Sequence, residues 1–305
     1  FWFKRDLRTE DNTGLYRAVN DSDEVIPVYI LDEDILKHYG KGSKRLSFFY
    51  NALHNLDLKL RDMGSRLLAV KGRAEEIFPD LLKRYEADAL YCNRANGFYG
   101  VKRDYNVQQI CKSLDVEFKK CQDTFLVPPS DVDQRKVFTP FFKLWEKKQK
   151  GKENPALATI DTPGITDIVP LEDLIGGVRE DMASMWPVDF AEKRLQEFDF
   201  DSYEETRNLP YMDGTSRLSP YLRFGIVSVR KVYNAAMRNS PEANTYVSEL
   251  AWREFWYHIM HYFPETRHME FQEKRRNMKW INNERWFIAW TKGLTGYPIV
   301  DAGMR

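Results

Sequence analysis

The stretch from Asp213 to Gly225 carries the densest set of polar side chains that could bind a small anion. Its sequence is DGTSRLSPYLRFG, in which Thr215, Ser216 and Ser219 supply hydroxyl groups on a turn that leads into a predicted helix. Backbone N–H groups at a helix start, together with the guanidinium of Arg217, suit a phosphate or pyrophosphate. A hydroxyl-rich helix cap explains the same residues without any ligand.

A second candidate site lies on a predicted helix over residues 244–263. At 3.6 residues per turn, one face of this helix carries a carboxylate, two indoles and a guanidinium. These residues are Glu249, Trp252, Arg253 and Trp256. Such a set suits a cleft that stacks a flat ring and hydrogen-bonds its edge. The alternative is an ordinary core face with a stabilising i,i+4 ion pair between Glu249 and Arg253.

Two further patterns are compatible with binding. Tyr203 and Arg207 share a face if their stretch is helical, and an exposed acidic helix start is the alternative. Trp280, Trp286 and Trp290 follow the basic run from Lys274 to Lys279, a combination that can contact phosphates and bases. The alternative there is a solvated charge run beside core tryptophans.

The N-terminal turn is also rich in charge. Residues Lys4 to Arg8, with Asp11-Asn12, follow the first predicted strand, and ligands usually bind at the carboxyl edge of a parallel sheet. These charges could instead tie two domains together. Residues 92–104, CNRANGFYGVKRD, also follow a strand and could line a cleft or form a simple turn. No metal site is predicted, because the five histidines and three cysteines show no ligand spacing.

The elements that must position these residues change along the chain. Over the first 120 residues, strand and helix patterns alternate, which predicts a doubly wound parallel sheet. Strands are expected at 2–3, 25–31, 66–70, 89–92 and 116–119, and helices at 13–19, 46–63, 74–85 and 101–114. Asn12 is the expected N-cap of the first helix. No GxGxxG follows the first strand, so the usual dinucleotide fingerprint is absent.

The rest of the chain divides into a linker and a helical domain. Prolines and glycines recur between 121 and 185, which predicts a long surface linker without long elements. From Phe190 onward the pattern is helical, with candidate helices at 222–238, 244–263 and 284–290. We therefore predict three parts: an α/β domain over 1–122, a linker over 123–185 and an all-α domain over 186–305.

Composition excludes several classes of protein. The 305 residues carry 46 basic and 46 acidic side chains, so a uniformly basic nucleic-acid coat is excluded. Apolar runs such as 25–31 are far shorter than the roughly 18 residues of a spanning helix. No membrane association is expected, and the unpaired cysteines fit a reducing compartment. The chain starts within a predicted strand and stops within a predicted helix, so we expect a fragment that lacks its C-terminal part.

In their order, the motifs resemble the photolyase/cryptochrome flavoprotein family over essentially the whole chain. The resemblance is carried by the start Trp2-Phe3-Lys4-Arg5-Asp6-Leu7-Arg8 with Asp11-Asn12, by Asp123-Thr124-Phe125-Leu126, by Val137-Phe138-Thr139-Pro140-Phe141, by Tyr203 and Arg207 before Thr215-Ser216-Arg217-Leu218-Ser219, by Glu249-x-x-Trp252-Arg253-Glu254-Phe255, and by Thr295-Gly296-Tyr297-Pro298-Ile299-Val300-Asp301-Ala302. Within the family, Glu249 favours a cyclobutane pyrimidine dimer photolyase, because (6-4) photolyases and animal-type cryptochromes tend to have Gln there.

The resemblance implies an FAD held in the helical domain, of which this chain would carry an incomplete copy. Its implied contacts are Tyr203, Thr215, Ser216, Arg217, Leu218 and Ser219, with Tyr246 where relatives often place a Trp. Glu249 and Trp252 would face a flipped-out pyrimidine dimer. Arg207, Arg253 and Trp256 would line the DNA side. Trp280 matches the outer member of the tryptophan chain that reduces the flavin, and the inner partners would lie beyond Arg305.

The implied function is light-driven repair of UV-damaged DNA by electron transfer from excited, reduced FAD. The alternative is a cryptochrome-type blue-light photoreceptor that does not repair DNA. Gly100 stands where folate-using relatives have an acidic residue, so folate is not the expected antenna, and another antenna or none remains open. We expect a monomer that is cytoplasmic, nucleoid-associated in a prokaryote or nuclear in a eukaryote. The fragment alone is expected not to retain FAD.

Overall fold

The structure is a computed structural model that describes residues 1–39, 43–165, 169–175, 187, 189–240 and 244–305. These residues form two compact units, Phe1–His258 and Ile259–Arg305. The expected boundary between linker and helical domain, at 185–186, lies outside the described residues.

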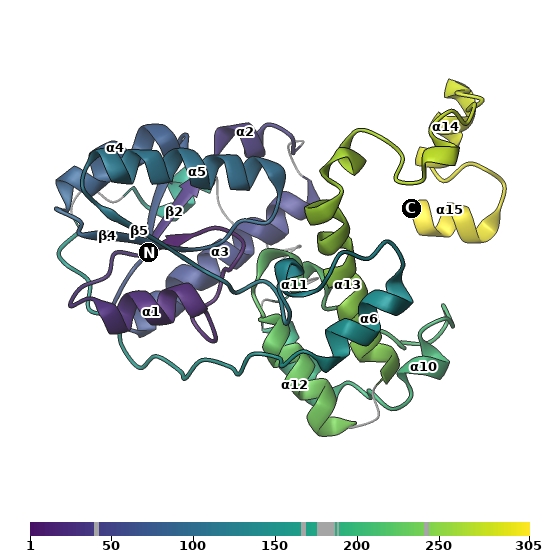
Figure 1. Ribbon diagram of the computed structural model, residues 1–305, viewed down its shortest axis with the longest axis horizontal. Helices are drawn as coiled ribbons and strands as arrows, with labels where there is room; N and C mark the ends of the chain where they lie inside the picture. The colour runs from purple at the N-terminus through teal and green to yellow at the C-terminus, as the bar shows by residue number, and fades with distance from the viewer. Residues whose placement is uncertain (40–42, 166–168, 176–186, 188, 241–243) are drawn as a thin grey trace. The chain divides into compact units, whose positions relative to one another are not determined.

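A parallel five-stranded sheet forms the N-terminal part of the first unit (Figure 1). Its strands run in the order β3-β2-β1-β4-β5, which confirms the doubly wound α/β prediction. Their bounds are β1 (Trp2–Phe3), β2 (Val28–Leu31), β3 (Leu68–Lys71), β4 (Ala89–Asn93) and β5 (Glu117–Cys121). Trp2 pairs with Val28 on one side and with Cys92 on the other, so β1 lies at the centre.

Helices cover both faces of this sheet (Figure 1). They are α1 (Thr13–Asp21), α2 (Glu33–Leu36), α3 (Lys44–Asp62), α4 (Ala74–Arg84) and α5 (Phe98–Ser113). One core packs Phe3 with leucines of α1 and α3, and the other packs Trp2 with Phe78 of α4 and Val107 of α5. The two first-strand residues thus point to opposite faces, as the two-residue period of a strand requires. Asn12 caps α1 as expected, its side chain accepting from the Leu15 N–H.

The connection after β5 contains more regular structure than its prolines suggest. It forms the 3₁₀ turn η1 (Pro129–Asp131) and the helices α6 (Phe138–Lys147) and α7 (Leu171–Ile175). The expectation that no long element survives there was wrong at α6, because Pro140 stands in the first turn, where a helix needs no N–H donor. The stretch near Ile160 has no regular secondary structure and contacts the α/β part, where the Val25 N–H donates to the Asp161 carbonyl at 2.7 Å.

The remaining described residues are mostly helical, as predicted. The first unit continues with α9 (Phe190–Glu197), α10 (Tyr203–Thr206), α11 (Ser219–Phe224) and α12 (Val229–Asn239), and α13 (Asn244–Tyr262) crosses the boundary between the two units after His258. The helix expected over 222–238 is two helices, because Gly225 at φ 66° ends α11 in the left-handed region. The second unit contains η2 (Pro264–Arg267), η3 (Glu273–Arg275), α14 (Glu284–Thr291) and α15 (Pro298–Met304).

No helix among the described residues has the length and apolar character to cross a bilayer. No group of three or more His, Cys, Asp or Glu side chains among them is arranged to hold a metal ion.

Candidate functional site

Helix α13 carries the second sequence motif and divides it between interior and surface. Ala251, Phe255 and His258 are fully or almost fully buried, and Trp256 is 57% exposed. Trp252 lies between these extremes and is partly buried. The helix therefore buries Phe255 in the core and leaves the rings of Trp252 and Trp256 at least partly exposed.

Glu249 pairs with Arg207 and not with Arg253. The Arg207 guanidinium donates to a Glu249 carboxylate oxygen at 2.6 Å, and both side chains are partly exposed. This hydrogen bond is the main reason that the pKa of Arg207 is raised. The alternative interpretation of this motif, an i,i+4 ion pair between Glu249 and Arg253, is thus not what the structure shows, since Arg253 donates to the Thr124 carbonyl at 3.0 Å.

Tyr203 joins this group through its ring. The Arg207 guanidinium lies 5.3 Å from the centre of the Tyr203 ring, as their expected shared face requires. Tyr203 also contacts Tyr246 edge to face, with ring centres 5.0 Å apart. Tyr246 is 5% exposed, burial raises its pKa to about 12, and its hydroxyl pairs with the Ser216 hydroxyl at 2.9 Å. Tyr246 therefore contacts both Tyr203, from the Tyr203–Arg207 pattern, and Ser216, from the polar turn.

The polar turn from Asp213 to Ser219 has mixed accessibility. Thr215 and Ser219 are exposed, whereas Leu218 as a whole residue is only 1% exposed. Arg217 takes φ 55° and pairs with Asp213 at 2.8 Å. Helix α11 has only six residues, so its dipole adds less to anion binding than the sequence suggested. The exposed hydroxyls remain suitable donors for a phosphate.

Trp252 stacks closely on a ring from the linker. Its ring centre lies 3.7 Å from that of Phe138, and the two planes differ by 7°. Trp256 follows on the same helix at 5.8 Å from Trp252. The side chains expected to meet a flat ligand ring thus form a continuous aromatic surface, to which the linker adds a third ring.

A buried carboxylate that the sequence analysis did not single out holds the linker on α13. Glu254 is 1% exposed and accepts from the backbone N–H groups of Leu126 and Val127, and from the Trp145 indole at 2.7 Å. Burial raises the pKa of Glu254, and these three donors oppose that effect. The carboxylate stood in the quoted motif, but its spacing along the helix gave no sign of partners more than 100 residues away.

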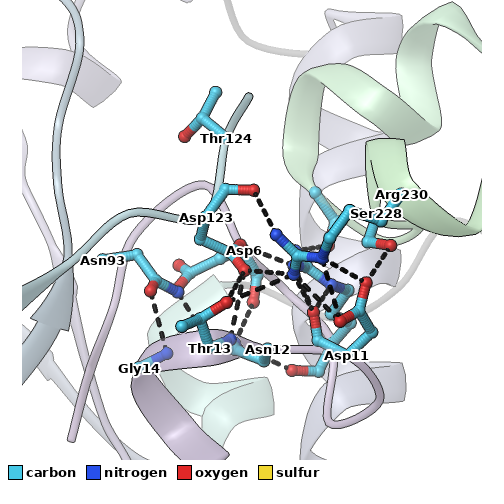
Figure 2. A network of polar contacts seen from close by, with 12 residues as sticks. Asp6, Asp11, Asn12, Thr13, Gly14, Asn93, Asp123, Thr124, Ser228 and Arg230 are labelled. Carbon is cyan, nitrogen blue, oxygen red and sulfur yellow. Dashed lines mark hydrogen bonds and ion pairs between the residues drawn. The ribbon is translucent and has the colours of Figure 1, made fainter. Parts of the chain in front are cut away.

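The charged N-terminal turn ties the α/β part to α12 (Figure 2). Arg230 donates to the carboxylates of Asp11 at 2.9 Å and Asp123 at 2.8 Å, and Arg8 pairs with Asp123. Ser228, the N-cap of α12, donates to Asp11. Of the two interpretations of this turn, a ligand site or a tie between two parts of the chain, the structure therefore favours the tie. The sequence indicated Asp123 only as part of a motif and did not indicate Arg230, because their partners are distant in sequence.

Side chains that follow β1 and β2 pair with residues of α5 at the carboxyl edge of the sheet. Lys4 donates to Asp104 at 2.8 Å, and Asp32 accepts from the Tyr99 hydroxyl at 2.7 Å and pairs with Arg103. At Gly100, an added Cβ would lie 2.7 Å from the Ala95 Cβ, so a larger side chain would displace its neighbour. The chain therefore lacks an acidic group where the resemblance places one for folate.

Trp280 belongs to the second unit. It is 72% exposed, and Trp286 on α14 is 62% exposed. Trp280 therefore belongs to a different unit from the candidate residues on α10, α11 and α13.

Comparison with known proteins agrees with this arrangement. A family model described as DNA photolyase matches residues 1–161, and a model described as the FAD-binding domain of DNA photolyase matches residues 246–305. Deoxyribodipyrimidine photo-lyase of a Synechococcus strain is 32% identical over 100% of this chain and 69% of its own length. The homologue of Halobacterium salinarum is 30% identical, over 100% of this chain and 70% of its own length.

Solved structures extend the similarity. The archaeal photolyase from Sulfolobus tokodaii, crystallised with two FAD molecules, is 31% identical with a TM-score of 0.86, over 100% of this chain and 69% of that one. A Synechocystis cryptochrome is 26% identical with a TM-score of 0.87, over 100% and 69% of the two chains. The chain belongs to the DNA photolyase family, and its residues 246–305 are part of the FAD-binding domain of that family.

Proposed function

We propose that the protein repairs cyclobutane pyrimidine dimers in DNA with blue light. The observation that carries this proposal is the pairing of Glu249 with Arg207 beside the partly exposed Trp252. A carboxylate held in place next to an indole can hydrogen-bond the edge of a pyrimidine while the indole stacks on its face. The similarity to deoxyribodipyrimidine photo-lyases supports the same reaction.

The chain offers groups that fit an FAD. The exposed hydroxyls of the polar turn suit the pyrophosphate, and the partly exposed Tyr203 ring, which packs on the buried Tyr246, offers apolar ring surface. We propose the following contacts: Tyr203, Thr215, Ser216, Arg217, Leu218, Ser219 and Tyr246. When bound and reduced, FAD would supply one electron to the lesion on excitation and take it back after the two ring bonds have broken.

The protein side of the mechanism is positioning. Arg207 fixes the orientation of the Glu249 carboxylate, so that the free lone pairs of the carboxylate can accept a hydrogen bond from a ring N–H on the edge of the flipped-out base. Trp252 supplies stacking that repays part of the cost of extruding the lesion, which is a few kcal/mol. Arg253 and Trp256 extend the proposed DNA side of α13, and Trp280 is the proposed outer electron relay. The division into 1–122, 123–185 and 186–305 is proposed as the domain arrangement.

The rival is a blue-light photoreceptor of the cryptochrome type, which the similarity to the Synechocystis protein favours. The test uses the full-length protein with reduced flavin and a thymine-dimer oligonucleotide, following the return of thymine absorbance under blue light and in the dark. We expect repair only in the light, and its loss when Glu249→Ala and Trp252→Ala are combined. The exposed Glu265→Ala is the control. Absence of repair by a flavin-loaded protein would decide for the photoreceptor.

A further inference from the structure

The linker ring that stacks on Trp252 has no role in the proposed site so far. We propose that Phe138 is a positioning residue for lesion recognition: it covers one face of the Trp252 indole and so presents the opposite face to a flipped-out base. The inference rests on the proposed repair function, which assigns stacking to Trp252. It concerns a residue of the linker, whereas the proposed site otherwise uses α10, α11 and α13.

The ring geometry points to a support. Phe138 and Trp252 are nearly parallel, with ring centres 3.7 Å apart and planes 7° apart. A contact that close and flat leaves no room for a base between the two rings. A ligand that stacks on Trp252 must therefore use its other face or displace Phe138.

The surroundings of Phe138 favour the first of these. Its ring packs at 5.6 Å against Phe142 on the same helix and edge to face at 5.7 Å against Phe255. Phe255 is 3% exposed, so this contact joins Phe138 to the buried core. Displacing Phe138 would break these contacts together, whereas a base that stacks on the opposite face of Trp252 leaves the contacts of Phe138 in place.

The helix that carries Phe138 is itself firmly held. Phe141 and Trp145 on α6 are each 1% exposed, and the Trp145 indole donates to the buried Glu254 of α13. Phe138 begins α6, so the packing of α6 on α13 fixes its position. A supported indole has less rotamer freedom to lose when a base stacks on it, and such preorganisation raises affinity without any new contact.

The experiment compares dark binding to a thymine-dimer oligonucleotide and to the undamaged oligonucleotide of the same sequence. It uses the full-length, FAD-loaded protein. Phe138→Leu removes the flat support, Phe138→Met does so with a flexible side chain of similar size, and Phe138→Tyr retains the ring. Phe142→Leu is the matched control, since Phe142 lies on the same helix and has a contact with Phe138 but none with Trp252. Trp252→Leu tests the stacking itself.

We expect Phe138→Leu and Phe138→Met to lower the preference for damaged over undamaged DNA about 5-fold, with unchanged FAD content and unchanged affinity for undamaged DNA. Phe138→Tyr should restore the preference and Phe142→Leu should retain it. An unchanged preference in Phe138→Leu or Phe138→Met would overturn the inference, and a higher one would identify Phe138 as a gate that the lesion displaces. If Trp252→Leu also leaves the preference unchanged, it is the proposed function that fails.

Discussion

Arg207 has two candidate roles: it could orient the Glu249 carboxylate, or it could bind a DNA phosphate. Its ion pair with Glu249 is partly exposed, so it contributes at most about 1 kcal/mol to stability. We expect Arg207→Gln to leave the free energy of unfolding within about 1 kcal/mol of the wild type. Repair should fall more than affinity for undamaged DNA, because Glu249 loses its fixed orientation.

Urea unfolding, repair kinetics and DNA binding measure these three quantities in the full-length protein. Arg84→Gln is the control, since Arg84 forms an exposed ion pair with Asp80 on α4. If affinity falls equally for damaged and undamaged DNA, with repair of bound lesions unaffected, Arg207 is a phosphate contact and its pairing with Glu249 is incidental.

Asp123 is expected to make the stability of the fold depend on pH in the acid range. Burial alone would raise its pKa, but the guanidinium groups of Arg8 and Arg230 outweigh burial and hold the pKa at about 2. Because this value lies below the ordinary 3.8, the stabilisation is fully present above pH 4 and is lost as the pH falls through about 2. The shift corresponds to about 2 kcal/mol at neutral pH.

Asp123→Asn should therefore lower the free energy of unfolding by about 3–5 kcal/mol at neutral pH, since it leaves two buried guanidinium groups short of a counter-charge. Its further loss between pH 4 and pH 2 should be smaller than in the wild type by about 2 kcal/mol. Urea unfolding across this pH range measures both effects, with the exposed Asp131→Asn as control. If wild type and variant lose the same amount of stability between pH 4 and pH 2, Asp123 is not the group responsible for this loss.

At the scale of elements, the break between α11 and α12 is set by a close approach. Gly225 has φ 66°, and a Cβ there would lie 2.7 Å from the Asp6 Cα and closer still to the Arg5 carbonyl oxygen. Gly225→Ala should cost at least about 2 kcal/mol of stability, from the left-handed backbone and from the clash together. Gly97→Ala is the control, because its φ is negative and nothing lies within 4 Å. Thermal unfolding with equal losses for the two variants would refute this.

The elements themselves were largely predictable, and their contacts were not. The alternation of strands and helices follows from local periodicity, which is why β2, β3, α4 and α13 lie where the sequence placed them. The break at Gly225 depends on the carbonyl of Arg5, which local patterns do not contain. In the same way, the partner of Glu249 lies 42 residues away and those of Glu254 more than 100. Spacing along one helix predicts a face, but a partner from another element decides the pairing.

At the scale of the whole molecule, the zero net charge hides an uneven distribution. Residues 1–120 hold 21 basic and 19 acidic side chains, residues 121–199 hold 10 and 15, and residues 200–305 hold 15 and 12. The acidic excess is confined to residues 121–199. The helical part, which carries the proposed DNA side, has a small basic excess and so does not repel DNA through its net charge. DNA binding that rests on local phosphate contacts is sensitive to salt even when the net charge is zero.

The last prediction concerns how electrons reach the proposed flavin site from outside. Trp280 is 72% exposed, so a reductant in solution can reach its indole, as an outer relay requires. Phenylalanine is much harder to oxidise than tryptophan, and Trp280→Phe should therefore remove most of the light-driven reduction of oxidised flavin in the full-length protein. Repair by protein whose flavin is reduced chemically should not change, because that electron does not pass through Trp280. Flavin absorbance under blue light with an added thiol measures the first rate, and Trp286→Phe, also exposed, is the control. Undiminished photoreduction in Trp280→Phe would show that electrons enter by another route.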